Sequence, residues 1–335
     1  MLAGAALSLP ALSACRVGPV AIGQPEAYSP PPPGIDEQYR RDAVTMLTRT
    51  HHLAQDLLKA PSPAPELAPD TPLHAFVLQC SLAAAEHGEA MRTGAENEQT
   101  AQSASPAAST AAATDGSASV TDLITALTEQ RALLINATVQ VSGSLARLTA
   151  SIGAWSCWAL SRAHRISPSL ELPAPPTTAD VTPTRPVPTA DPAYIDPQDA
   201  VPDQLTAAQE HEWFAAYALE VLAARSPQNQ RSALTSRIRQ HRRRAADYGT
   251  AAAAIGSEQV AQKPVYDLPG SGRADEQLAA LSTRISEQSL TNAIRLSSLI
   301  TFEQRAPFIA GWASEGGVFG TLTTALTPEP GLAVD

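Results

Sequence analysis

The sequence predicts an all-α protein of two helical blocks joined by a proline-rich linker. Hydrophobic residues make up 44% of the 335 residues but aromatic residues only 4%, and alanine-rich runs occur throughout. Apolar residues recur at intervals of three and four, and no segment combines strict alternation with β-branched residues. Ten of the 29 prolines lie between Pro168 and Pro202, in a stretch without hydrophobic periodicity. Residues 166–203 are therefore expected to be an extended, exposed linker.

The first block, 36–165, is predicted to contain four helices and one long loop. The helices are expected at 36–59, 71–92, 120–141 and 144–165, the last two separated by Ser142-Gly143-Ser144. One stripe at helical spacing carries Cys80 and His87, both predicted to lie in the core. Cys80 and Cys157 are expected to be packed thiols; the alternative is a disulfide between them. Residues 93–118 are rich in Ala, Ser, Thr and Gly and are expected to be a disordered loop.

The second block, 204–326, carries clearer helix signals. Asp203 is expected to cap a helix to about 224, and Ser226-Pro227 to begin another that Gly249 closes. After a turn at 269–272, a long helix is predicted from about 273 to 302. A last helix from about Pro307 to Ala325 completes a four-helix bundle, followed by a tail, 327–335.

Each helix of the second block is predicted to place one polar residue on its core face. Glu210 shares spacing with Trp213, Phe214 and Tyr217, His241 with Ile238 and Tyr248, and Glu315 with Trp312 and Phe319. Asn292 lies on the apolar face of the third helix. We therefore regard Glu210, His241 and Glu315 as a candidate site, with Tyr217, Arg244 and Asn292 as supporting residues.

Inward carboxylates and a histidine in a helical bundle suggest iron or manganese, but the ligand set is incomplete. A di-metal centre needs Glu-x-x-His from two helices, and this motif is absent from the sequence. The alternatives are a mononuclear site of Glu210, His241 and Glu315, or a buried Glu210–His241 pair joined by Arg244, which needs no metal. The second interpretation is favoured, and no cofactor is assigned.

The net charge, the absence of several catalytic motifs and a basic run each limit the classes of function that the sequence allows. The net charge of −10 makes nucleic acid an unsuitable partner. Gly-rich phosphate loops, Gly-x-Ser-x-Gly and Cys-x-x-Cys are absent. The absence of any nucleophile–base pattern argues against a hydrolase. A basic run on the second helix is expected to be a solvated surface; it comprises Arg237, Arg239, Arg242, Arg243 and Arg244.

The N-terminus predicts export and a lipid anchor. Residues 1–15 contain an apolar stretch from Leu2 to Ala14, too short to span a bilayer, that ends in Leu12-Ser13-Ala14-Cys15. This sequence resembles a bacterial lipobox, with Cys15 as the lipidated residue. Because no Lys or Arg precedes Cys15, a basic region is expected upstream of Met1. The Pro-rich segment 16–35 would be a stiff tether to the outer face of the cytoplasmic membrane.

The second block resembles a known family. Ala207-Ala208-Gln209-Glu210-His211 with Tyr217, the run from His241 to Asp247, and Tyr266-Asp267-Leu268-Pro269 are similar to the ferritin-like domain of unknown function in actinobacterial envelope lipoproteins. The resemblance covers roughly 203–326. It implies a ferritin-like four-helix bundle and does not by itself imply ferroxidase activity. The family's acidic residue early in the third helix falls near Ser286. The first block looks like a diverged companion bundle.

Three functions remain open from the sequence. The first is a non-catalytic lipid-anchored envelope protein with a structural or binding role and an unknown protein partner. The second is a metal-binding protein using Glu210, His241 and Glu315. The third is a carrier of small hydrophobic ligands, in which Trp213, Phe214, Tyr217 and Trp312 line a cavity instead of packing as core.

Overall fold

The computed structural model describes residues 34–60, 65–99, 118–186, 200–268 and 275–332. These residues form eight α-helices and three short 3₁₀ helices and contain no β-strand, which confirms the all-α class. They belong to one compact unit, 33–335. Cys15 and almost all of the predicted tether lie outside the described residues.

The helix boundaries follow the predicted signals closely. The elements are α1 (Ile35–Lys59), α2 (Pro72–Gln99), α3 (Val120–Gln140), α4 (Gly143–Ile166), α5 (Ala200–Arg225), α6 (Gln228–Ala254), α7 (Asp275–Leu299) and α8 (Ala306–Leu322). Ser119 and Asp122 form a capping box at the start of α3, and α6 begins after Pro227. Pro307 lies in the first turn of α8, as expected.

Two predicted helix ends were wrong. The helix α2 continues to Gln99, so the first residues of the predicted loop 93–118 are helical, while 100–117 lie outside the described residues. Gly249 does not end α6, because it lies inside the helix and gives the Gln209 side chain of α5 room to approach. The helix ends at Ala254, where Gly256 has a φ of 75° and Ser257 N–H donates to the Ala252 carbonyl.

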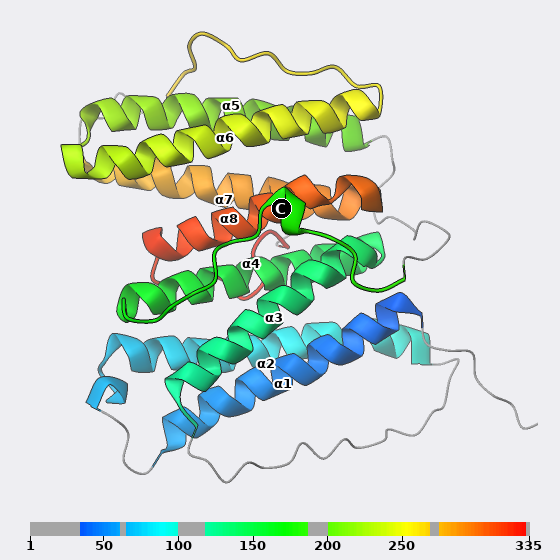
Figure 1. Ribbon diagram of the computed structural model, residues 1–335, viewed down its shortest axis with the longest axis vertical. Coiled ribbons are helices and arrows are strands. Elements are labelled where there is room, and N and C mark those ends of the chain that lie inside the picture. The colour runs from blue at the N-terminus through cyan, green and yellow to red at the C-terminus, as the bar shows by residue number, and fades with distance from the viewer. Residues whose placement is uncertain (1–33, 61–64, 100–117, 187–199, 269–274, 333–335) are drawn as a thin grey trace, which may run out of the picture. The chain divides into compact units, whose positions relative to one another are not determined.

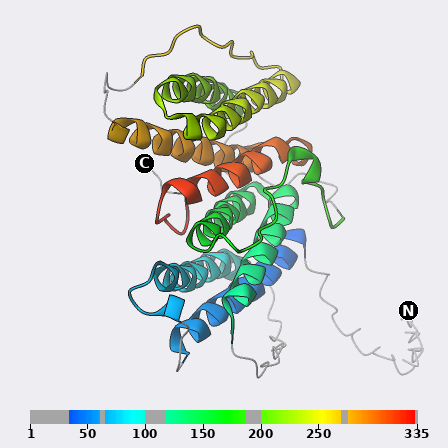
Figure 2. The same ribbon diagram turned by 60° about the vertical axis from the view of Figure 1, so that its left-hand side comes forward.

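The same helix order occurs twice along the chain (Figure 1). In the first block α1 packs on α2 and α3 on α4; in the second, α5 packs on α6 and α7 on α8. In both, the short connections join these pairs and the long connection joins the second helix to the third. The helices α4 and α8 lie side by side and join the two blocks, which both views show (Figure 2).

Small residues bring α8 close to α4. A Cβ atom at Gly316 would lie 2.6 Å from the Ala154 carbonyl oxygen, and one at Gly320 would lie 2.5 Å from that of Trp158. In return, Gly153 makes room for the Trp312 ring, which is fully buried. Because packed side chains fill the space between these helices, the two blocks share a core.

The linker predicted at 166–203 is shorter than expected. Ile166 is the last residue of α4, Thr178–Asp180 forms a 3₁₀ helix, and α5 begins at Ala200. Asp203 therefore lies in the first turn of α5 and does not cap it, contrary to the prediction.

The described part of this linker is attached to the helices. The Arg131 guanidinium donates to the Pro173 carbonyl at 3.2 Å, and Arg185 forms an ion pair with Asp42 of α1. Val181 is buried in the core cluster that contains Trp312. Residues 187–199 lie outside the described part of the chain.

The segment after α8 is also attached. His87 of α2 donates to the Pro328 carbonyl, Ser151 of α4 donates to that of Pro330 at 2.8 Å, and Arg147 donates to that of Gly331 at 3.3 Å. This segment, predicted as the beginning of a tail, therefore covers the buried face of α2 and α4 as far as residue 332.

Candidate functional site

Four charged or ionisable side chains meet in the interior of the second block. Glu212 comes from α5, His241 and Arg244 from α6, and Glu315 from α8, and each is buried. The Arg244 guanidinium lies between the two carboxylates: Nε is 3.0 Å from Glu212 Oε2, and a terminal nitrogen is 2.7 Å from Glu315 Oε1. One cation thus links α6 to both neighbouring carboxylates.

His241 completes the charge network. Its Nδ1 lies 2.7 Å from Glu212 Oε2 and also 2.7 Å from an Arg244 nitrogen. Since Nδ1 has a single position for a hydrogen or a lone pair, only one of these contacts is a hydrogen bond, and donation to the carboxylate is the favourable one. Nε2 lies 3.9 Å from Glu315 Oε1 and has no hydrogen-bond partner among the described residues.

The electrostatics of the network keep both carboxylates ionised. Burial alone would raise the pKa of Glu212, but the charges of Arg244 and His241 outweigh it and lower the pKa to about 2. Burial likewise opposes ionisation of Glu315, whose pKa is nevertheless lowered by Arg244, His241 and Arg237. The pKa of Arg244 is raised, because both carboxylates outweigh its own desolvation.

Close packing surrounds the network. Tyr248 and Phe308 are fully buried, and their rings stack with centroids 4.8 Å apart. A Cβ at Gly311 would lie 3.2 Å from the Tyr248 hydroxyl and 3.4 Å from Arg244 Cδ, so the glycine provides space for both side chains. Side chains of α5, α6 and α8 therefore hold these charges in a water-poor interior, where a paired charge is stable and an unpaired one is costly.

These residues do not fit a metal centre. The Arg244 cation binds one oxygen of Glu212 and one of Glu315, so a positive charge already lies between the two carboxylates. The other oxygen of each has no hydrogen-bond partner among the described residues. Within the described ranges, no group of three or more His, Cys, Asp or Glu side chains has an arrangement that could hold a metal. The arrangement instead matches the buried, hydrogen-bonded alternative, with a different glutamate.

The prediction that Glu210 faces the interior was wrong. Glu210 lies at the surface, where its carboxylate pairs with Lys263, and Glu212 takes the buried position. The inward face of α5 follows Leu205, Ala208, Glu212, Ala215 and Leu219. Glu212 stands at helical spacing from Ala208 and Leu219, a signal that the stronger aromatic pattern hid.

The aromatic stripe of α5 packs elsewhere. The Trp213 indole donates to the Val260 carbonyl at 2.9 Å, and the Tyr217 and Tyr266 rings lie 5.6 Å apart. These contacts join α5 to the long connection after α6. Trp312 belongs to the α4–α8 core, so the four aromatics proposed as a cavity lining do not share one site.

The other residues that the sequence analysis singled out do not belong to the buried charged network. Asn292 is partly exposed and accepts a hydrogen bond from Gln288, one turn earlier. Among the basic run of α6, Arg239, Arg242 and Arg243 are exposed as predicted, but Arg244 is buried and Arg237 is partly buried. Cys80 and Cys157 are buried free thiols, and His87 lies in the core, as expected.

The first block has a neutral counterpart of this network. Thr50 of α1 donates to Gln130 of α3 at 3.0 Å, and Gln130 donates to Ser156 of α4 at 2.9 Å. All three side chains are buried. Each block thus contains a buried group of hydrogen-bonded side chains that joins three of its helices; the group described in the first block is neutral and that in the second is charged.

Comparison with known proteins adds no relative. No protein-family model matches the sequence, and neither the curated proteins nor the solved structures give a match. In the described part of the chain, no helix combines the length and apolar character needed to cross a bilayer.

Proposed function

We propose that this protein is a non-catalytic, lipid-anchored protein of the bacterial cell envelope, whose helical body is a structural or ligand-binding module. The observation that carries the proposal is the position of Arg244 between Glu212 and Glu315. A guanidinium paired with two carboxylates is a stabilising contact, and its positive charge between them disfavours a metal cation at the same place. One oxygen of each carboxylate and His241 Nε2 have no hydrogen-bond partner among the described residues, so it is the charge of Arg244, and not a lack of free ligand atoms, that disfavours a metal.

The helix order supports a ferritin-like interpretation of both blocks. Ferritin-like bundles join two helical hairpins by one long connection. The order α5–α6, long connection, α7–α8 has this form, and so does α1–α2, long connection, α3–α4. The proposal therefore includes two diverged bundles of this type, in which the charged network replaces the metal site.

The proposed anchor is a lipid on Cys15, followed by a proline-rich tether. Full-length protein with a basic segment placed before Met1, expressed in bacteria fed an alkyne-labelled fatty acid, should carry the label, and the same protein with Cys15→Ala should not. Absence of the label from the protein that retains Cys15 would refute the anchor and leave the interpretation of the helical body unaffected.

Thermal unfolding with added metal tests the non-catalytic assignment. A ligand that binds only the folded state raises the unfolding temperature, and the rise increases with the logarithm of the ligand concentration above the dissociation constant. We expect Mn²⁺ and, without oxygen, Fe²⁺ to leave the unfolding temperature of the full-length protein unchanged. A concentration-dependent rise that Glu212→Gln abolishes and Glu210→Gln retains would contradict the proposal.

A further inference from the structure

Two pockets meet at the gap between α6 and α8. The larger has a volume of about 590 Å³ and lies between α4, α6, α8 and the 172–175 segment. The second, about 580 Å³, lies between α5, α6 and α8. They share four lining residues, two on α6 and two on α8: Ala233, Arg237, Val318 and Thr321. We call the two together the α6–α8 cleft; each pocket has a size typical of small-molecule sites.

The lining of the cleft contains arginine and histidine side chains and no carboxylate. Arg131, His164 and Arg237 line the larger pocket, and Arg225 and Arg237 the smaller, while neither lining includes an Asp or Glu. In a chain with a net charge of −10, this is a marked local reversal of sign. Such a lining attracts anions and disfavours cations.

Arg237 lies at the meeting point of the two pockets. Its terminal nitrogens donate to Ser282 and Ser286 of α7, at 2.6 and 2.8 Å. Serine hydroxyls supply no negative charge, and no carboxylate of the described residues forms an ion pair with Arg237. Its Nε is buried without a hydrogen-bond partner in the same part of the chain. The guanidinium is largely buried and its hydrogen bonds go to neutral groups. The charge of Glu315 acts on it, but no ion pair within the described residues satisfies it directly.

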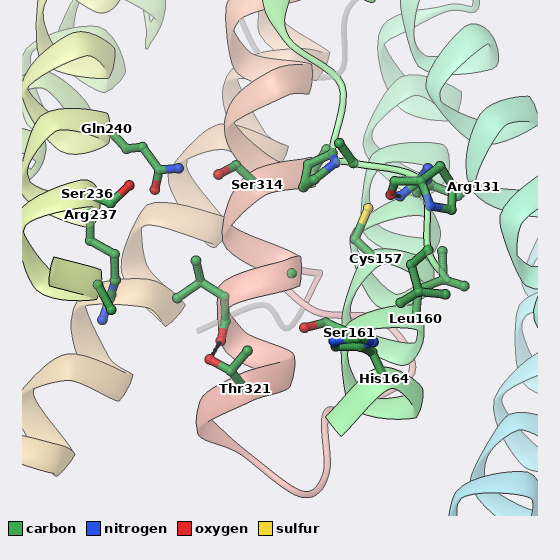
Figure 3. A pocket seen from close by; sticks show the side chains of 18 residues that line it. Arg131, Cys157, Leu160, Ser161, His164, Ser236, Arg237, Gln240, Ser314 and Thr321 are labelled. Atoms are coloured by element: carbon green, nitrogen blue, oxygen red, sulfur yellow. Dashed lines mark hydrogen bonds between the residues drawn. The ribbon is translucent and has the colours of Figure 1, made fainter. Parts of the chain in front are cut away.

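The rest of the cleft offers apolar surface. Leu160, Leu172, Pro173 and Val318 line the larger pocket, and Leu222 and Leu234 the smaller. Figure 3 shows Ser236, Arg237 and Gln240 on one side of the larger pocket, with Leu160 and Cys157 facing them from the other. An occupant that satisfies both the cation and these walls has an anionic head and an apolar chain.

We propose that the α6–α8 cleft binds an anionic amphiphile, with a carboxylate or phosphate head at Arg237 and a single apolar chain along the α4–α8 wall. This inference deepens the proposed role as a binding module and rests on it. The metal and lipidation experiments above do not depend on the cleft. A negative result for ligand binding in the cleft is therefore distinguishable from a negative result for the proposed function.

Titration calorimetry with dodecanoate tests the proposal. The protein is the full-length chain carrying Cys15→Ser, so that no acyl chain of its own competes. We expect one dodecanoate per chain, and at least about tenfold weaker binding of dodecanol, which has the same chain and no charge. Dodecyl phosphate distinguishes the two heads: tighter binding than dodecanoate indicates a phosphate ligand, and weaker binding a carboxylate.

A matched pair of variants locates the head. Arg237→Gln should weaken dodecanoate binding about tenfold or more, whereas Arg239→Gln, two residues away on the exposed face of α6, should change it less than about twofold. Equal effects of the two variants, or equal affinity for dodecanol and dodecanoate, would overturn the assignment. The assignment would also be overturned if the protein bound neither dodecanoate nor dodecyl phosphate.

A second variant tests the apolar wall independently of Arg237. Gly317 lines the larger pocket, and a Cβ atom there meets no other atom within 4 Å. Gly317→Phe should therefore fill the pocket while the protein stays folded, and should abolish dodecanoate binding. Unchanged affinity in a folded Gly317→Phe protein would show that the ligand does not occupy this pocket.

Discussion

Glu212 and Glu210 are two residues apart and have opposite environments. Glu212 is fully buried against Arg244 and His241, whereas Glu210 pairs with Lys263 at the surface. Removing one partner of a buried ion pair leaves the other charge uncompensated, which costs far more than the loss of an exposed pair. The two glutamates thus provide an internal comparison for the structural role of the network.

Glu212→Gln should lower the free energy of unfolding by about 3 kcal/mol, because Arg244 and His241 lose their charged partner. Glu210→Gln should change it by less than about 0.5 kcal/mol. Urea unfolding followed by circular dichroism measures both. Equal losses, or a Glu212→Gln protein as stable as the wild type, would show that the network does not stabilise the fold.

His87 gives the chain a pH-dependent contact. Burial lowers the pKa of His87 to about 4, although its hydrogen bond to the Pro328 carbonyl acts in the opposite direction. His87 therefore binds a proton near pH 6.5 in the unfolded chain and only near pH 4 in the folded chain. The contribution of neutral His87 to the free energy of unfolding is fully present above pH 6.5. It falls by on the order of 3 kcal/mol as the pH drops to 4.

His87→Gln should remove most of that pH dependence, because glutamine keeps an N–H donor for Pro328 and does not titrate in this range. Urea unfolding at pH 7, 5.5 and 4 should show a smaller loss of stability for the variant than for the wild type. Parallel losses in both proteins would place the pH dependence on other groups.

At the scale of the helix, close approach of α8 to α4 joins the two blocks. The glycines Gly316 and Gly320 face the α4 backbone, while their neighbour Gly317 faces the cleft. Gly316→Val should destabilise the protein by about 2 kcal/mol, since its Cβ would overlap the Ala154 carbonyl. Gly317→Ala should leave stability unchanged or raise it by up to about 1 kcal/mol through helix propensity. Thermal unfolding of the two variants distinguishes them, and a tolerated Gly316→Val would contradict the close packing.

Helix positions were largely predictable, because local chemistry determines them. Ser119, Pro227 and Pro307 mark helix starts through caps and fixed backbone angles, which act within a few residues. The identity of the buried glutamate was not predictable in this way. Trp213 and Tyr217 have the periodicity of a core face, but they pack on the connection after α6, whose course no local pattern reveals.

Hydrogen bonds to backbone carbonyls could not be predicted from the sequence either. The carbonyls of Pro328, Pro330 and Gly331 accept hydrogen bonds from α2 and α4, yet a carbonyl is present at every residue and gives no pattern. Arg237 looked like part of a solvated basic run for a related reason. Its burial depends on α7 and α8 packing over α6, which spacing within α6 does not show.

At the scale of the whole molecule, the two blocks share the α4–α8 core and should unfold together. The described residues belong to one compact unit, in which Trp312 of α8 packs against Gly153 of α4. Differential scanning calorimetry should show one transition whose calorimetric and van't Hoff enthalpies agree. Two separate transitions would mean that the blocks are independent domains on a linker.

Arg244 lies between Glu212 and Glu315, where its charge takes the place of a metal ion. Elemental analysis of full-length protein purified without chelators, from cells grown with added iron and manganese, tests this assignment most directly. We expect less than about 0.1 metal ion per chain, since the Arg244 cation already compensates both carboxylates. One or more iron or manganese ions per chain, lost in Glu212→Gln and kept in Glu210→Gln, would contradict it.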